Sequence, residues 1–301
     1  MSAPLQVWLP ALARFEPAHP LRRLLTRADR QADGSQGYLA GLAAWFDAPQ
    51  PLPAGALTRE ALAGDAGDAS WLCADPAWIE PDMSGVRLLA CGRMGLSQEE
   101  AQAIAQALVP LFEEQDMHLQ LTTPGRWHLR LPPGMAVPEF PAPEQALGEN
   151  LLQHLPQGPQ GRRWRILQND LQVALHQHPL NARRRAAGQP PVNSLWLWGA
   201  GALPAHVRTQ LQGVVSDDPL LRALAARAGV GLRSHAEDAW GLPPGWLLDL
   251  QDLPAAQIAG TWWPRIDALA RRHVLGLDFA SGERWQHRPG HRWRFWRRAE
   301  A

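Results

Sequence analysis

The sequence contains no lysine, only two cysteines and no excess of either charge. Its 29 basic residues are all arginine and are balanced by 29 acidic residues, so no net field draws the chain to nucleic acid or an anionic membrane. Exclusive use of arginine is typical of a GC-rich coding sequence, and an arginine cluster alone therefore does not indicate a phosphate site. No apolar run reaches about 18 residues, which argues against a membrane span.

The two cysteines, Cys73 and Cys91, lie in apolar surroundings and outside any CxxC or Cys/His spacing. Neither a zinc site nor a disulfide framework is indicated, and we expect a reduced, cytoplasmic protein without a metal or another cofactor. With 301 residues, 46% of them hydrophobic, the chain is long enough to form one large domain or two modest ones.

The first 70 residues alternate apolar runs with segments rich in proline and glycine. Residues 5–12 are predicted as a strand that stops near Pro10, and 19–29 and 38–46 as helices. The stretch 48–70 is predicted as a connection with at most one helical turn.

The middle third is predicted as a compact α/β unit. Residues 86–92 are strand-like, and Ser97 with Glu100 forms a capping box at the start of a helix over 96–115. The alternation of apolar and polar residues over 117–132, around a Pro-Gly pair, predicts a β-hairpin.

The last 140 or so residues continue the alternation of helices and strands. Helices are predicted over 163–180, 217–230 and, broken near Pro264, 261–274; strands over 193–201 and 245–253; and a hairpin over 275–298. The chain as a whole therefore reads as α/β with some antiparallel pairing.

The segment HPLNARRRAAGQPPVNSLWLWGAG, residues 178–201, has two interpretations. Its three consecutive arginines could bind a phosphate or carboxylate bidentately. The candidate anion-binding residues are His178, Asn181, Arg183, Arg184, Arg185 and Asn193. The favoured alternative is scaffold, in which Asn181 caps a helical turn and Asn193 binds backbone at the start of a buried strand.

Two other features carry weaker signals. Asp75, which precedes a proline, is predicted to cap a turn, a functional carboxylate being the alternative. His176 and His178 are two apart, a spacing that does not place two metal ligands on one helical face.

Tryptophan is abundant, with 15 residues. It is favoured in pockets and interfaces but is also ordinary core. The candidates for an aromatic platform facing a ligand or partner are Trp240, Trp246, Trp262 and Trp263.

The C-terminal segment 283–298 holds six arginines, two histidines and three tryptophans. Such interleaving can bind single-stranded nucleic acid by stacking and phosphate contacts. The favoured alternative is a twisted hairpin around Pro289 and Gly290, with Trp285, Trp293 and Trp296 on alternating faces and partly buried.

The segment 178–201 resembles a stretch of the archaeal-type cofactor-independent phosphoglycerate mutases that reads His-Pro-x-Asn, Arg, Gly, Pro-x-Asn and Gly-x-Gly. The matching positions are His178, Pro179, Asn181, Arg184, Gly188, Pro191, Asn193, Gly199 and Gly201. Over its whole length the chain more closely resembles a bacterial family named after the regulatory protein RpfE, often described as related to those mutases. WLCADPAWIEPD, GLSQEEAQAIAQAL, RWHLRLP and RFWRR carry that likeness.

The mutase resemblance implies an α/β fold with a reduced alkaline-phosphatase-like core, formed by 1–69 and 150–301, and an inserted smaller α/β domain at 70–149. In that superfamily two metal ions held by Asp and His side chains bind the phosphate, and a Ser or Thr hydroxyl is transiently phosphorylated.

The chain departs from that pattern at the positions that would supply the metal ligands. Pro10 and Ala11 stand where the resemblance places the first metal-binding Asp, and no Asp/His pairing follows in the C-terminal half. The family's arginine-rich run in the insert is reduced to Arg93, a further candidate for anion binding.

We therefore predict a non-catalytic, regulatory or binding relative of the mutases, with no catalytic residue and no metal ligand. Its expected partner is a phosphorylated small acid or another protein, and neither nucleic acid nor a membrane is expected. One alternative is a metal-dependent mutase or phosphotransferase whose ligands the sequence does not reveal. The other is a nucleic-acid-associated regulator that uses the basic C-terminus.

Overall fold

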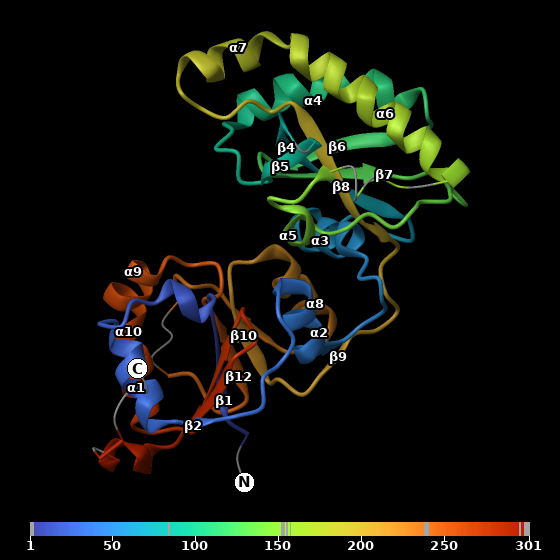
Figure 1. Cartoon of the computed structure of the whole chain (residues 1–301). Helices are drawn as coiled ribbons and strands as arrows, with labels where there is room; N and C mark the ends of the chain where they lie inside the picture. Colours follow the sequence, from blue (N-terminus) through green and yellow to red (C-terminus); the bar gives the residue numbers. More distant parts are fainter. Residues whose placement is uncertain are drawn as a thin grey trace. The chain divides into compact units, whose positions relative to one another are not determined.

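The computed structural model describes residues 3–83, 85–151, 154, 156, 158–237, 241–294 and 296–297. The chain forms two compact units (Figure 1). Unit 1 comprises Met1–Ala48 and His206–Ala301, and unit 2 comprises Pro49–Ala205.

Unit 1 is built on a seven-stranded sheet with the order β11-β10-β12-β1-β13-β14-β2. The strands are β1 (Leu5–Leu9), β2 (Asp29–Arg30), β10 (Gly213–Val215), β11 (Gly231–Arg233), β12 (Trp246–Asp249), β13 (Leu275–Phe279) and β14 (Arg284–His287). In sheet order, the strands from β11 to β13 pair in parallel, and β14 and β2 add an antiparallel edge. A short pair, β3 (Phe46–Asp47) with β9 (Arg208–Thr209), lies apart from it.

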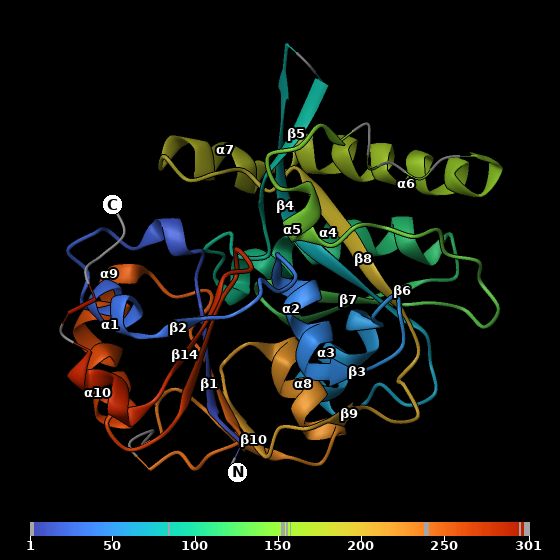
Figure 2. The same ribbon diagram turned by 60° about the horizontal axis from the view of Figure 1, so that its bottom comes forward.

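Helices cover both faces of this sheet, as a mostly parallel sheet requires (Figure 2). One face carries α1 (Pro20–Arg27), α9 (Ala255–Gln257) and α10 (Trp263–Ala270), and the other carries α2 (Tyr38–Trp45) and α8 (Pro219–Arg227). Leu21, Leu24 and Leu25 of α1 share a buried cluster with Ile266 and Leu269 of α10 and the apolar residues of β1 and β13.

Unit 2 is built on an antiparallel sheet centred on a long strand, β4 (Trp71–Asp82). β4 pairs with β5 (Gly85–Cys91) and β7 (Arg126–Arg130) along one edge and with β8 (Ser194–Gly201) along the other, while β6 (His118–Thr123) pairs with β7. Alternate residues of β4 face opposite sides. Leu72 and Ala74 join the core under α4 (Gln98–Glu113) and α6 (Gly158–Gln177), whereas Trp71 packs with α3 (Ala54–Ala63).

Two shorter helices complete unit 2: α5 (Pro143–Ala146) and α7 (Pro179–Ala186). The capping box of Ser97 and Glu100 at the start of α4 is confirmed, with both reciprocal hydrogen bonds formed. The hairpin β6–β7 and the α/β class are confirmed as well. No helix among the residues described is long and apolar enough to cross a membrane.

Three local expectations differ from the structure. The stretch predicted as a connection contains the ten-residue helix α3, whose Thr58 is fully buried. Residues 289–293 form a 3-10 helix, and the C-terminal hairpin turns instead between β13 and β14. The expected insert ended at residue 149, but unit 2 extends to Ala205, because β8 pairs with β4 and α6 packs on α4.

Candidate functional site

The two asparagines of the segment 178–201 bind backbone, as predicted. Asn181, fully buried, donates from Nδ2 to the carbonyl oxygens of Leu175 (2.8 Å) and Val192 (2.7 Å), and its Oδ1 accepts from Val192 N (2.8 Å). Asn193 Oδ1 accepts from Ile79 N (2.8 Å), and Nδ2 donates to Ile79 O (2.7 Å). Each amide thus pairs with both backbone groups of one residue, as a neighbouring strand does.

Asn181 was expected to cap a helical turn, but the residue that caps α7 is His178. Its Nδ1 accepts from Leu180 N at 3.3 Å. The reason is chain position: His178 directly precedes the helix, whereas Asn181 lies within it and has its amide turned to the interior.

The three arginines of α7 do not act together. Arg184 is 1% exposed; its Nη2 donates to Met94 O at 2.6 Å, its Nε donates to Pro190 O at 2.9 Å, and Nη1 lies 3.3 Å from Glu100 Oε2. Its guanidinium therefore links α7 to the residues at the start of α4. Arg183 and Arg185 lie on the exposed side of α7, and Arg93 is also exposed.

Of the four candidate platform tryptophans, Trp240 lies outside the described residues. Trp246 is buried against Gly213 and Gly231, and Trp262 is buried against His235. Trp263 alone of the three that are described is half-buried and lines a cavity. Trp246 and Trp262 are therefore core residues.

The C-terminal segment carries its basic residues largely in ion pairs. Arg294 and Arg297 both reach Asp29, and Arg284 pairs with Asp278. Trp293 and Trp296 are 62% and 67% exposed, so the expectation that they are partly buried is wrong; the 3-10 helix replaces the hairpin that would have placed them on a sheet face.

The carboxyl edge of the parallel sheet in unit 1 gathers polar residues that were not among the candidate site residues. Ligand sites of α/β proteins lie at this edge. Asp249, the last residue of β12, is 1% exposed; its Oδ2 accepts from Ser216 Oγ at 2.7 Å and its Oδ1 from Gln251 N at 3.2 Å. Burial raises the pKa of Asp249 to about 7.

The neighbours of Asp249 are likewise bonded within the protein. Ser216 Oγ accepts from Asp218 N at 2.9 Å, and Asp218 Oδ1 accepts from Leu221 N, capping α8, and from the Tyr38 hydroxyl. His235 Nε2 donates to the carbonyl oxygen of Asp249 at 2.6 Å. The other ring nitrogen of His235, Nδ1, lies 3.2 Å from Asp217 Oδ2.

These residues do not fit the pair of metal ions that the mutase resemblance implies. A metal site needs several oxygen, nitrogen or sulfur ligands that converge on one point. Both oxygens of Asp249 accept hydrogen bonds within the protein, and β1 ends at Leu9 and is followed by Pro10, so this strand end supplies no carboxylate. Within the described ranges, no group of three or more His, Cys, Asp or Glu could hold a metal ion.

A second polar cluster is buried in unit 2 around Asp75. Asp75 lies in the middle of β4, so its predicted role as a turn cap is wrong. Arg126 Nε lies 3.0 Å from Asp75 Oδ1, Trp198 Nε1 donates to Oδ2 at 2.9 Å, and Arg126 Nη1 contacts Cys73 Sγ at 3.2 Å. Burial raises the pKa of Cys73 to about 11, which keeps the thiol protonated and unreactive at neutral pH.

His128 extends this cluster toward α3. Thr58 Oγ1 donates to Ala54 O at 2.6 Å and therefore accepts from His128 Nε2 at 2.9 Å, which leaves His128 Nδ1 to accept from Thr122 Oγ1 at 2.7 Å. Burial lowers the pKa of His128 to about 3, so the ring is neutral. The cluster is a buried structural network of hydrogen bonds and an ion pair. Its residues come from segments too far apart in the sequence for their spacing to reveal it.

No family model matches the chain. Sequence comparison finds similarity to a probable 2,3-bisphosphoglycerate-independent phosphoglycerate mutase of Geobacter sulfurreducens, 38% identical over 93 residues, which are 29% of this chain and 23% of that protein. A corresponding mutase of Methanosarcina mazei is 33% identical over 97 residues, 31% of this chain and 24% of that protein. The chain is related to the cofactor-independent phosphoglycerate mutases. The match spans about a quarter of the length of these curated relatives.

Two solved structures resemble the chain over most of its length. The cofactor-independent phosphoglycerate mutase of Thermoplasma acidophilum has 14% identity and a TM-score of 0.42, with 96% of this chain and 90% of that chain covered. A protein of Pyrococcus horikoshii has 12% identity and a TM-score of 0.46, with 95% and 87% covered.

Proposed function

We propose that the protein is a non-catalytic relative of the cofactor-independent phosphoglycerate mutases, of the RpfE-like regulatory type, which acts in the cytoplasm by binding a ligand or partner. In this proposal unit 2 is an insertion into a reduced core formed by the two segments of unit 1. The observation that supports it is the bonded state of Asp249, which is held by Ser216 and Gln251.

Phosphoryl transfer of the kind the resemblance implies needs an activated hydroxyl and a set of metal ligands acting together. Ser216 is a hydroxyl at the sheet edge, but it donates to Asp249 and accepts from Asp218 N, so it is held as a bridge between two loops. Groups that act as a catalytic unit lose nearly all rate when one member is missing. The edge therefore supports binding or scaffolding rather than transfer.

The competing hypothesis is a metal-dependent mutase or phosphotransferase. One observation favours it: Asp217, Asp218, His235 and Asp249 cluster at the sheet edge where α/β enzymes bind ligands. Among the described residues, however, these side chains do not form a group of three or more that could hold a metal ion.

Calorimetric titration separates the two hypotheses. Manganese is titrated into the full chain and into Asp249→Ala, followed by 3-phosphoglycerate with and without manganese. We expect that the full chain shows no saturable manganese binding that is lost in Asp249→Ala. Any heat of binding of 3-phosphoglycerate should be the same with and without manganese. Two equivalents of tightly bound manganese that are lost in Asp249→Ala contradict the proposal.

A further inference from the structure

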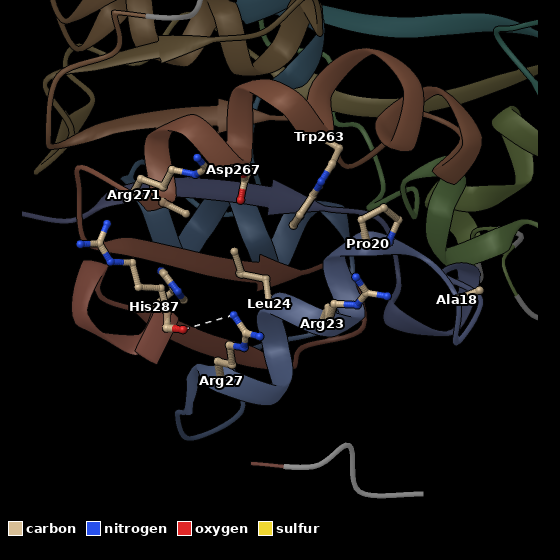
Figure 3. A pocket seen from close by; sticks show the side chains of 11 residues that line it. Ala18, Pro20, Arg23, Leu24, Arg27, Trp263, Asp267, Arg271 and His287 are labelled. Carbon is tan, nitrogen blue, oxygen red and sulfur yellow. Dashed lines mark hydrogen bonds and ion pairs between the residues drawn. The ribbon is translucent and has the colours of Figure 1, made fainter. Parts of the chain in front are cut away.

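Unit 1 contains a cavity of about 500 Å³ between α1 and α10 (Figure 3). This volume is in the range of sites for small ligands. The lining side chains belong to both ends of the chain: Ala18, Pro20, Arg23, Leu24 and Arg27, and Trp263, Asp267, Ala270, Arg271, His287 and Arg292.

The charge of the cavity wall is unlike that of the chain. The whole sequence is neutral, yet the wall has four arginines against one aspartate. Arginine abundance alone does not explain this, because elsewhere in the same unit arginines are matched by acids, as Arg294 and Arg297 are by Asp29. The cavity therefore has a local excess of positive charge, which attracts an anion.

Several of these guanidiniums have donors to spare. Arg271 Nη2 pairs with Asp267 at 2.6 Å, and Arg27 Nη1 donates to Arg292 O at 3.3 Å. The side chain of Arg23 is exposed and has no hydrogen bond or ion pair within the part of the chain that is described. An arginine side chain has five N–H donors, and phosphate oxygens accept from guanidinium in pairs.

The two ends of the cavity differ in character. Arg27, Arg271 and His287 lie toward one end, and Pro20 and Trp263 lie toward the other, with Leu24 between them (Figure 3). His287 is 5% exposed, and its Nδ1 has no hydrogen-bond partner. Burial lowers the pKa of His287 to about 4, so the ring is neutral at pH 7 and adds a polar group without charge.

We propose that this cavity binds a small phosphate monoester, with the phosphate held by Arg27, Arg271 and Arg292 and the organic group packed on Leu24 and Trp263. The inference rests on the proposed function in that it supplies a site and a ligand class for a protein that acts by binding. A dianionic phosphate suits several guanidiniums better than a carboxylate does, because it has more oxygens to accept their donors.

Calorimetric titration with inorganic phosphate and with phenyl phosphate tests the proposal. The titrations contain a chelator, so metal-dependent turnover cannot contribute. We expect a single site that prefers phenyl phosphate. Arg27→Gln and Arg271→Gln should each weaken both probes about tenfold or more, as loss of a charge-assisted hydrogen bond does. Asp267→Asn should tighten both, since it removes the one negative charge of the wall.

Trp263→Ala tests the organic end of the site separately. It should reduce the preference for phenyl phosphate over inorganic phosphate and change the affinity for inorganic phosphate by less than about twofold, because the ring is removed and every charge is kept. Arg272→Gln is the matched control, since Arg272 is the exposed neighbour of Arg271 and does not line the cavity.

Three results overturn the inference: no binding of either probe at millimolar concentration, an equal loss in Arg272→Gln and Arg271→Gln, or tighter binding in Arg27→Gln. These failures are distinct from failure of the proposed function, which is decided by metal binding and turnover. Circular dichroism of each variant establishes that it is folded.

Discussion

Replacement of Asn181 by alanine removes three hydrogen bonds from the interior of unit 2. A typical hydrogen bond contributes about 1 kcal/mol, and a buried polar group left without a partner costs about 1 to 3 kcal/mol. The substitution leaves the carbonyl oxygens of Leu175 and Val192 and the N–H of Val192 without these hydrogen-bond partners. We therefore expect the free energy of unfolding of unit 2 to fall by about 3 to 4 kcal/mol.

Two further variants are compared with Asn181→Ala. Asn193→Ala removes two hydrogen bonds to Ile79 from a less buried site, so it should cost about 1 to 2 kcal/mol. Arg183→Ala, on the exposed side of α7, should change stability by less than about 0.5 kcal/mol. Urea unfolding, with the transition of unit 2 assigned by hydrogen exchange, measures all three. A cost for Asn181→Ala below that of Asn193→Ala refutes the scaffold assignment.

Three further predictions concern buried charge. Arg184→Met should destabilise unit 2 by about 3 to 5 kcal/mol, because it leaves the carbonyl oxygens of Met94 and Pro190 without their donor and removes the ion pair with Glu100; a urea-unfolding loss under about 1 kcal/mol contradicts this. Asp249 has a raised pKa, so unit 1 should lose stability as pH rises from 4 to 7, by at most roughly 4 kcal/mol, and Asp249→Asn should lose less over that range. His128 has a lowered pKa, so unit 2 should lose about 3 kcal/mol as pH falls from 6.5 to 4, and His128→Gln should flatten that part of the unfolding curve.

Local signals in the sequence predicted the elements that local chemistry determines. Ser97 and Glu100 reach each other's backbone within one helical turn. The alternating residues over 117–132 form two strands that pair directly across a short turn. Both were therefore predicted correctly. The helix α3 was missed because its residues resemble a loop in composition. It is stabilised from outside, by packing so close that a Cβ on Gly55 would lie 2.7 Å from Trp71 O.

The remaining features depend on distant parts of the chain. The extent of unit 2 follows from the pairing of β8 with β4, and the buried pair of Asp75 and Arg126 joins strands separated by a long helix. Asparagine scaffolding could be anticipated, because Asn181 and Asn193 flank a Gly- and Pro-rich exit from a helix. The position of Asp249 at a strand end was not predicted, because the predicted strand ran to residue 253 whereas β12 ends at Asp249.

A coupled mutase assay tests the central claim, that this relative of the mutases binds rather than transfers. The full chain is incubated with 3-phosphoglycerate and manganese, and formation of 2-phosphoglycerate is followed through enolase. The account predicts no turnover above the rate without protein, with or without metal, and the same result for Asp249→Ala. Turnover that disappears with a chelator and in Asp249→Ala would contradict it.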